Sequence, residues 1–488
     1  MPLTAAEVRT ILAQAAARAL ADGQPLVITV VSREGIVVGS LRMAGAPLTE
    51  ADPRFGTLDL EFTCRAKART AAFLSSDQHA FNTRTARFII QDNFPPDVPN
   101  APGGPLYGVQ FSNLACGDVV GEALPGPRPF AQRGNSLSGD TGSMPLYRDG
   151  CLVGAVAVEG AAEPDDVSEE RAAWTASMGF RPAESILGSL IHIDGLRVEF
   201  MEHTPPDDVV VPAYGDLLVG GATELAAPMD APAPQVFPTG VFGGLTCEIR
   251  FPVIDSPRPV PATDRLLAAD LLAMLDVAAA RSARTRAGIR RPLGTPMRCF
   301  ITIVDLDGRV LGSIRTPEAT LFSFDVSVQK ARTCAFFSTD TFALTCRALG
   351  FMAQGFFPPG IGVTPRGPLA NDFHLAIGED PLPADVLALQ DAFSVPLFAP
   401  IEDPPASGTF TCAPPVVPEL PNGFTIFPGG VPLYKNGRLV GACGVSGDGV
   451  DQDDFIAQAA GELFPPPPGA RCDEVAEGAA VAALRARV

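Results

Sequence analysis

Histidine, a common metal ligand, is scarce in this chain, which has 4 histidines in 488 residues. Its 10 cysteines never form a Cys-x-x-Cys pair, so zinc ribbons, thioredoxin-like motifs and c-type haem attachment lack their residues. We therefore expect buried, reduced thiols. The P-loop, G-x-S-x-G and H-E-x-x-H motifs are also missing, which leaves nucleotide hydrolysis, serine hydrolysis and zinc proteolysis without their catalytic residues.

Positive charge is also in short supply. The chain has 36 Lys and Arg against 55 Asp and Glu, a formal net charge of −19, so no uniform positive field can hold a phosphate backbone. No run of 18 apolar residues occurs, and the N-terminus lacks a basic segment followed by an apolar one. We expect no nucleic-acid partner, no membrane association and a cytoplasmic location.

The composition is that of a folded chain. Apolar residues make up 46% of the sequence, enough for real cores, and the length predicts two to four domains. Glycine (48) and proline (49) together form about a fifth of the chain, below the roughly 25–30% typical of low-complexity disorder. Long, stiff loops between ordered elements are expected.

One unit occurs twice. Four stretches recur in the same order: residues 3–18 and 266–281, 31–42 and 304–315, 67–70 and 330–333, and 145–155 and 432–442. The second copy has gained ten residues around 286–295. The repeat predicts the following domains: a first domain over 1–203, a Pro/Gly-rich linker over 204–264, a second domain over 265–464 and a C-terminal tail over 465–488.

Within each copy the hydrophobic periodicity changes in a fixed order. In the first copy it predicts a helix over 4–21, a hairpin over 26–43, helices over 57–75 and 79–91, a hairpin over 145–158 and a further helix after Ser168. Edge strands are expected at 187–200 and 241–253, and a helical end at 473–487. Hairpins with helices grouped between them indicate an α+β fold with an antiparallel sheet.

Several of these motifs resemble the GlcG/HbpS family, the haem-binding or haem-degrading domain also found at the C-terminus of the PduO cobalamin enzymes. The similarity lies in the opening helix, the first hairpin, the Lys-Ala-Arg-Thr-Ala-x-Phe helix, the Gly-Gly-Pro-Leu-Tyr-Gly loop at 103–108 and the long stretch 427–447. The resemblance implies two tandem profilin-like domains, each an antiparallel sheet with flanking helices, forming a pseudo-dimer. It also implies a homo-oligomer or a subunit of a larger complex.

The resemblance implies a small-molecule ligand, haem or another tetrapyrrole, whose carboxylate is held by a cation of the Lys-Ala-Arg-Thr helix and by glycine-loop N–H groups. The residues concerned are Lys67, Arg69, Lys330, Arg332, Gly429 and Gly430. The lysine and arginine of each motif point about 200° apart, so one of each pair would reach the site. Alternatively these cations pair with carboxylates for structure. The first copy has an altered loop at 137–144.

His79 is the best histidine candidate for an iron ligand, against a helix-terminal or surface role. No histidine recurs between the copies, so a ligand shared by both cannot be histidine. Tyr107, Tyr147 and Tyr434 are alternative oxygen ligands, although packing in a hairpin explains the last two. The acidic cluster 448–454 lacks the glycine and glutamate of a calcium loop, so we predict an N-capping acidic turn and no metal site.

Three functions fit these patterns. The first is a binding protein for haem or another tetrapyrrole. The second is an enzyme on the same scaffold that acts on a small carboxylate or aromatic metabolite, with Lys330 and Arg332 as anion clamps. The third is an accessory or structural subunit whose tandem copies serve assembly.

Overall fold

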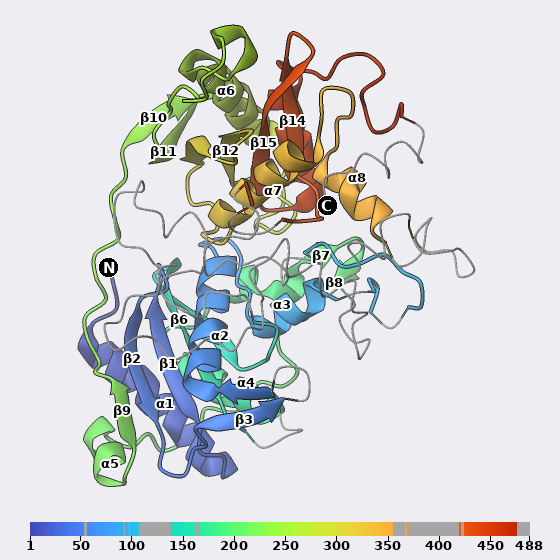
Figure 1. The fold of residues 1–488 in the computed structure, drawn as a ribbon. Helices are drawn as coiled ribbons and strands as arrows, with labels where there is room; N and C mark the ends of the chain where they lie inside the picture. Colours follow the sequence, from blue (N-terminus) through green and yellow to red (C-terminus); the bar gives the residue numbers. More distant parts are fainter. Residues whose placement is uncertain are drawn as a thin grey trace.

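A computed structural model describes residues 1–52, 56–91, 93–96, 98–106, 138–161, 166–354, 367, 419–420 and 424–475. Two halves, each built on an antiparallel sheet with helices, lie one above the other in Figure 1. The α+β fold predicted from the sequence is therefore confirmed. No helix among the described residues is both long enough and apolar enough to cross a membrane.

The first half begins with α1 (Ala5–Asp22), which has the expected capping box. Thr4 Oγ1 accepts the Glu7 N–H at 3.3 Å, and the Glu7 carboxylate accepts the Thr4 N–H at 2.8 Å. The sheet has the order β5-β6-β1-β2-β9. Its strands are β1 (Val27–Ser32), β2 (Val37–Arg42), β5 (Ser143–Arg148), β6 (Cys151–Glu159) and β9 (Thr223–Ala226). Both predicted hairpins are confirmed.

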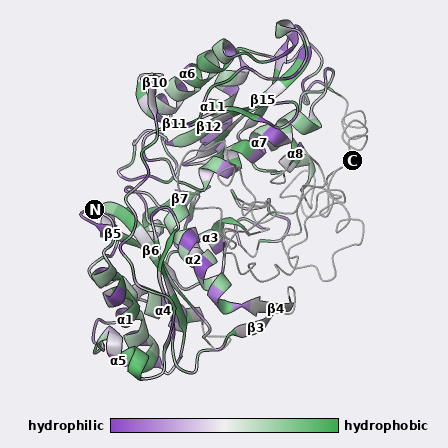
Figure 2. Ribbon diagram, turned by 60° about the vertical axis from the view of Figure 1, so that its left-hand side comes forward, coloured by the Kyte–Doolittle hydropathy of each residue, from purple (hydrophilic) through white to green (hydrophobic). Residues whose placement is uncertain are grey.

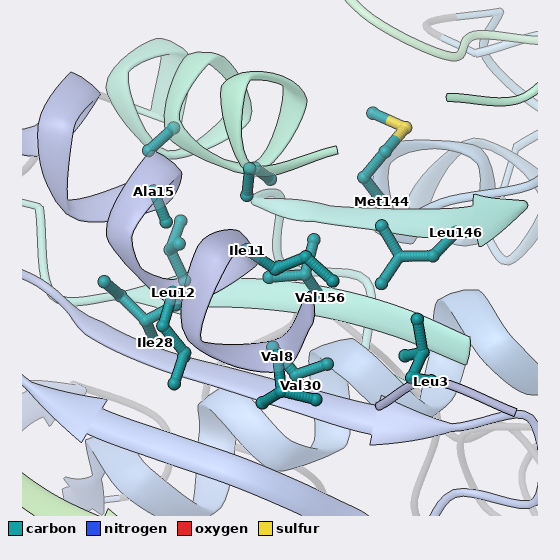
Figure 3. Packing of buried hydrophobic residues seen from close by; sticks show 14 of the residues in the cluster. Leu3, Val8, Ile11, Leu12, Ala15, Ile28, Val30, Met144, Leu146 and Val156 are labelled. Carbon is teal, nitrogen blue, oxygen red and sulfur yellow. The ribbon is translucent and has the colours of Figure 1, made fainter. Parts of the chain in front are cut away.

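Helices cover both faces of this sheet. α1 and α4 (Asp166–Ala176) lie on one face, and Figure 3 shows Val8, Ile11 and Leu12 of α1 packed over Ile28 and Val30 of β1. The other face is covered by α2 (Leu60–Leu74), which carries the Lys-Ala-Arg-Thr motif and follows a short hairpin of β3 (Thr49–Asp52) and β4 (Gly56–Asp59). The motif helix therefore packs on the face of the sheet opposite α1 and α4.

The third helix starts later than predicted. α3 spans Thr83–Ile89 rather than 79–91, because the Asn82 side chain caps it by accepting the Thr85 N–H at 3.0 Å. The preceding residues form a tight turn in which the Ser76 N–H donates to the His79 carbonyl at 2.9 Å. Periodicity alone cannot separate such a turn from the first turn of a helix.

The second half repeats the plan. Its elements are α6 (Ala268–Arg284), β12 (Cys299–Asp305), β13 (Val310–Arg315), α7 (Ser323–Phe337), α8 (Cys346–Met352), β14 (Gly430–Lys435), β15 (Arg438–Gly447) and α11 (Val450–Gly461). The sheet has the order β10-β11-β13-β12-β15-β14. α6 and α11 cover one face, and α7, which carries the second Lys-Ala-Arg-Thr motif, covers the other.

The predicted linker contributes strands to both sheets. After α5 (Tyr214–Val219), β9 pairs with β2 at the edge of the first sheet. β10 (Thr239–Phe242) and β11 (Leu245–Phe251) then extend the second sheet beyond β13. A strand is therefore present in the range 241–253, as expected, but β11 lies inside the sheet and β10 holds the edge. The segment 204–264 links the domains and also covers the two sheet edges that would otherwise be open.

The edge strand expected at 187–200 is wrong. This segment contains a two-stranded ribbon of β7 (His192–Ile193) and β8 (Leu196–Arg197), which is separate from the main sheet. It follows two short 3-10 turns at Glu184–Ile186 and Gly188–Leu190. Its apolar residues are buried against the helices instead of a strand edge, so a strand-like composition here does not produce sheet pairing.

Part of the expected tail belongs to the second half. The Ala343 N–H donates to the Ala470 carbonyl at 2.6 Å, and the Cys472 N–H donates to the Ala343 carbonyl at 3.1 Å. Ala80 makes the matching contact with the Ile186 carbonyl in the first half. Residues up to 475 therefore pack on the second domain. Most of the helix expected at 473–487 lies outside the described residues.

One hydrophobic cluster joins the two halves. It combines α2 side chains of the first half with residues of the second, among them Ile289, Phe300, Phe322, Phe324 and Phe427. The copies therefore pack directly on each other, as expected for a pseudo-dimer, and are not held by the linker alone. A two-fold axis between them stays a prediction.

Arg290, which lies in the ten-residue addition of the second copy, forms the polar part of this contact. Its guanidinium is buried and donates to the Asp448 carboxylate at 2.5 Å and to the Gln78 side chain of the first half at 3.2 Å, and it pairs with Glu318. Glu318 in turn accepts the Asp77 N–H of the first half at 2.9 Å. The addition thus fixes one half against the other.

Replacement of this arginine tests its role. Arg290→Ala leaves the buried Asp448 carboxylate without its cation, so we expect the free energy of unfolding to fall by about 3–5 kcal/mol. Urea unfolding followed by circular dichroism measures the change. Arg286→Ala, at an exposed arginine of the same addition, is the control and should change stability by less than about 0.5 kcal/mol. Equal small losses would show that Arg290 does not hold the halves together.

Candidate functional site

Lys67 lies at the centre of a cluster of three carboxylates, of which Glu159 and Glu169 are buried and Asp140 is exposed. The Lys67 side chain is fully buried, and its Nζ atom is 2.7 Å from Asp140, 2.7 Å from Glu159 and 2.6 Å from Glu169. The three carboxylates lie within 4.8 Å of one another, a spacing that could suit a metal ion, but here the ammonium group pairs with all three. Burial raises the pKa of Glu169 to about 7, although Lys67 acts in the opposite direction.

Lys330 occupies the same place in the second half with fewer charges. It is fully buried, donates to the Asp453 carboxylate at 2.8 Å and to the Val445 carbonyl at 2.9 Å, and lies 4.9 Å from the centre of the Phe427 ring. At the repeat offset of 145–155, Phe427 corresponds to Asp140. Burial raises the pKa of Asp453 to about 7 against the effect of Lys330. A cation–π contact thus replaces one ion pair.

The motif arginines point the other way, toward the first hairpin of each half. Arg69 Nε donates to the Gly35 carbonyl at 2.9 Å, and Arg332 Nε donates to the Gly308 carbonyl at 2.7 Å. Both guanidinium-bearing side chains are buried. The expected divergence of lysine and arginine is confirmed, and each of the two makes contacts inside its own domain.

The glycine pair of the second half, Gly429 and Gly430, is also in contact with residues of its own domain. Gly429 has φ of 119°, and its N–H donates to the Asp454 carboxylate at 3.2 Å, the place where an anionic ligand was expected. A Cβ atom at Gly430 would lie 2.7 Å from Cys346 Sγ and from the Lys330 carbonyl oxygen. The geometry therefore favours the structural alternative for the six predicted residues, and ligand binding by them stays a prediction.

His79 is fully buried, with both ring nitrogens in hydrogen-bond contact. Nε2 lies 2.8 Å from the Leu74 carbonyl oxygen and Nδ1 lies 2.7 Å from the Ser76 hydroxyl. Burial lowers the pKa of His79 to about 3, and Arg290 adds to the shift. The surface alternative is wrong, because the ring is fully buried, whereas its contact with the carbonyl of Leu74, the last residue of α2, fits the helix-terminal alternative. Iron ligation by this ring would require these contacts to break.

The tyrosines named as alternatives have packing roles where they are described. The Tyr147 hydroxyl donates to the carbonyls of Ser76 and His79 at 2.8 and 2.9 Å. The Tyr434 hydroxyl donates to the Thr339 carbonyl at 2.8 Å in the second half. Tyr107 lies outside the described residues. The repeated tyrosine therefore pins the same turn in each copy.

A pocket of about 220 Å³ lies where the two halves meet. The first half contributes the loop Pro102–Pro105 and Asp194 from the turn between β7 and β8, which Figure 1 shows near α8. The second half contributes α8, the loop before β14 and the start of α11. Its lining residues are Arg347, Gly350, Phe351, Gln354, Ile426, Phe427, Pro428, Val450 and Asp451. Both motif loops quoted for the family resemblance thus border one pocket.

Two contacts shape the first-half wall. The Gly104 N–H donates to the Gln91 carbonyl at 2.8 Å, and a Cβ atom at this position would lie 2.4 Å from the Ile89 carbonyl oxygen. Glycine is therefore needed for the loop to approach α3 so closely. The Gly103 N–H donates across to the Gln354 side chain at 3.3 Å, which ties the loop to the second half.

Arg347 is the cation of this pocket. Its Nε and Nη2 atoms each lie 2.6 Å from a carboxylate, of Asp454 and Asp451 respectively, and 47% of its side chain is exposed. Burial, with the Asp451 charge, raises the pKa of Asp194 on the opposite wall. Arg347 therefore stays accessible, while Asp451 and Asp454 fix the position of its guanidinium group.

The repeated counterpart, Arg84, is covered. It pairs with Glu170 at 2.6 Å, Glu202 at 3.4 Å and Glu199 at 3.6 Å, and only 14% of its side chain is exposed. Arg84 and Arg347 are separated by 263 residues, the same offset as the two Lys-Ala-Arg-Thr motifs, but they are not among the predicted site residues. Their recurrence was the available signal, and only the structure shows that one is closed off while the other borders a pocket.

The two lysine clusters differ in charge, which gives a paired test. Lys67→Met leaves three carboxylates without their cation, so we expect the free energy of unfolding at pH 7 to fall by about 3–5 kcal/mol. Lys330→Met leaves only the Asp453 carboxylate without its cation, so the free energy of unfolding should fall by less. Urea unfolding at pH 7 measures both.

The pH dependence follows from the carboxylates. Removal of Lys67 takes away the cation that lowers the pKa values of Asp140, Glu159 and Glu169 in the folded state. All three pKa values should therefore rise, those of Glu159 and Glu169 from positions already above the ordinary value, so the folded state binds more protons. The deficit of Lys67→Met relative to the unmodified chain should therefore shrink as the pH falls from 7 to 5. A deficit that is independent of pH would contradict the ion-pair assignment.

A known protein family matches this chain in two segments. A family model described as "Haem degrading protein HbpS-like" matches residues 3–174 and 275–462. A crystal structure of a PduOC:heme complex is 20% identical, with 41% of this chain and 95% of that chain covered and a TM-score of 0.24. The Klebsiella pneumoniae protein ORFY, of family model DUF336, is 18% identical, with 42% and 95% covered and a TM-score of 0.25. No curated protein matches the chain.

The two matched segments fall on the two copies that the repeats define, and together they span more than half of the chain. Each contains one Lys-Ala-Arg-Thr helix between the two hairpins of one sheet. The chain therefore belongs to the HbpS-like family of haem-degrading proteins and carries the family domain twice.

Proposed function

We propose that this protein binds haem or another tetrapyrrole, with one edge of the ligand in the pocket between the copies. The observation that carries the proposal is that both stretches of the family resemblance, 103–108 and 427–447, contribute residues to this pocket, Gly103–Pro105 and Phe427–Pro428, together with an accessible arginine. Membership of the HbpS-like family supports this class of ligand.

The wall chemistry suits such an edge. Phe351, Ile426 and Phe427 offer apolar and aromatic contact to a flat ring. Arg347 has five N–H donors, of which its partners Asp451 and Asp454 use only some, so the rest can bind a propionate. A volume of about 220 Å³ is below the roughly 300–1,000 Å³ of pockets that enclose a whole ligand. The remainder of the macrocycle would lie outside it.

Removal of the pocket arginine tests the site. Arg347→Ala should weaken hemin binding by about 10- to 150-fold, because a charge-assisted contact contributes about 1.5–3 kcal/mol. Hemin titration followed by absorbance measures the change. Arg84→Ala, the covered counterpart, is the matched control and should leave hemin affinity unchanged.

The same titration separates this pocket from the earlier candidate residues. Lys330→Met should leave hemin affinity unchanged in protein that retains its circular dichroism spectrum. A loss of binding with Lys330→Met and none with Arg347→Ala would move the site to the Lys-Ala-Arg-Thr helix. Absence of saturable binding by the unmodified chain would contradict the proposed ligand.

The iron spectrum gives a further prediction. His79 is held by two hydrogen bonds, and no histidine recurs between the copies, so we expect a high-spin haem with at most one protein ligand. His79→Gln should leave that spectrum unchanged. A low-spin spectrum typical of two histidine ligands, or a spectral change in His79→Gln, would contradict this expectation.

A further inference from the structure

A second open feature lies on the far side of the second sheet, away from the haem proposal. The helices α6 and α11, adjacent in Figure 2, enclose a groove of about 330 Å³. Its lining residues are Asp276, Val277, Ala280, Arg281, Arg284, Ala459, Glu462 and Leu463. The groove is therefore formed by side chains of two helices that are already fixed on the sheet.

Exposed apolar side chains gather on the same two helices. Leu272 is 48% exposed, Phe455 47% and Leu463 44%. Leu272 precedes Asp276 by one helical turn, and Phe455 and Leu463 are eight residues apart, so they continue the stripes that line the groove. The Arg281 guanidinium lies 4.3 Å from the centre of the Phe455 ring. Such a mixed apolar and cationic face is typical of a binding surface.

The first copy shows what covers the equivalent face. Arg18, which corresponds to Arg281 in the repeat, is 5% exposed and donates to the Pro206 carbonyl at 2.9 Å and to the Asp208 carboxylate at 3.0 Å. Pro205 is buried beside them. An extended Pro-Pro-Asp-Asp segment of the chain itself therefore lies against α1.

Further contacts anchor the same segment. Asp207 pairs with Arg181 at 2.5 and 2.8 Å, and Arg181 stacks at 4.4 Å on the Trp174 ring of α4. Downstream, Tyr214 and Leu217 pack on the first core. The segment thus combines acidic residues that contact arginines with an apolar anchor, and Arg18 and Arg181 of the first copy hold it in place.

We propose that the α6–α11 groove binds an extended, acidic, proline-containing segment of a partner protein, in the manner in which α1 and α4 bind residues 205–217. The repeat supports this occupant, because Arg281 corresponds to Arg18, which donates to the Asp208 carboxylate in the first copy. Arg281 and Arg284 border the groove together with Glu462 and Asp276, and the Asp276 carboxylate already accepts the Gly243 N–H at 2.7 Å. Leu272, Phe455 and Leu463 would contact the apolar part of the segment. This site is independent of the haem pocket.

A peptide of known sequence provides the probe. A fluorescein-labelled peptide with the sequence of residues 203–219 should bind the full chain saturably in fluorescence polarisation, and more weakly at higher salt. The double variant Arg281→Glu and Arg284→Glu should weaken binding at least tenfold. A peptide with Asp207→Asn and Asp208→Asn should lose a similar factor.

Two controls keep the outcome specific. Arg309→Glu, at an exposed arginine of the β12–β13 turn, should leave peptide binding unchanged, and the groove variants should bind hemin as the unmodified chain does. Peptide binding that is insensitive to the changes at Arg281 and Arg284 would place the peptide on the first copy and overturn the proposal. Absence of saturable binding would overturn it as well.

Discussion

The buried lysine of the Lys-Ala-Arg-Thr motif is the interaction on which each domain depends. It joins the motif helix, the last long strand and the last helix of the unit, because Lys67 contacts Glu159 and Glu169, and Lys330 contacts Val445 and Asp453. A buried ammonium without these partners would be costly. The most conspicuous cation of the repeat is therefore committed to the interior, and a ligand has to find its charge elsewhere.

Duplication leaves the two copies with the same arginines in different surroundings. Arg84 and Arg18 of the first copy are covered by the chain's own residues around 199–208, whereas Arg347 and Arg281 of the second copy border open pockets. Residues around 199–208 thus cover the two arginines of the first copy. The two halves therefore share a fold, and the arginines that border pockets lie on the second copy.

Local features were predictable from the sequence because they depend on nearby residues. The repeat, both hairpins, the capping box at Thr4 and the motif helices follow from periodicity and capping. The lysine clusters were not predictable in detail, since Glu169 lies 102 residues from Lys67 in the chain. The pocket was not predictable either, because its two walls come from different copies whose relative orientation no local pattern encodes.

That orientation is where the second copy's ten-residue addition acts. Ile289 enters the cluster that joins the halves, and Arg290 connects Gln78 of the first half with Asp448, which directly precedes the α11 turn. Val450 and Asp451 of the same turn line the pocket between the copies. Because a buried charge network tolerates little displacement, the addition that locks the halves together also sets the distance between the two loops that a ligand would have to bridge.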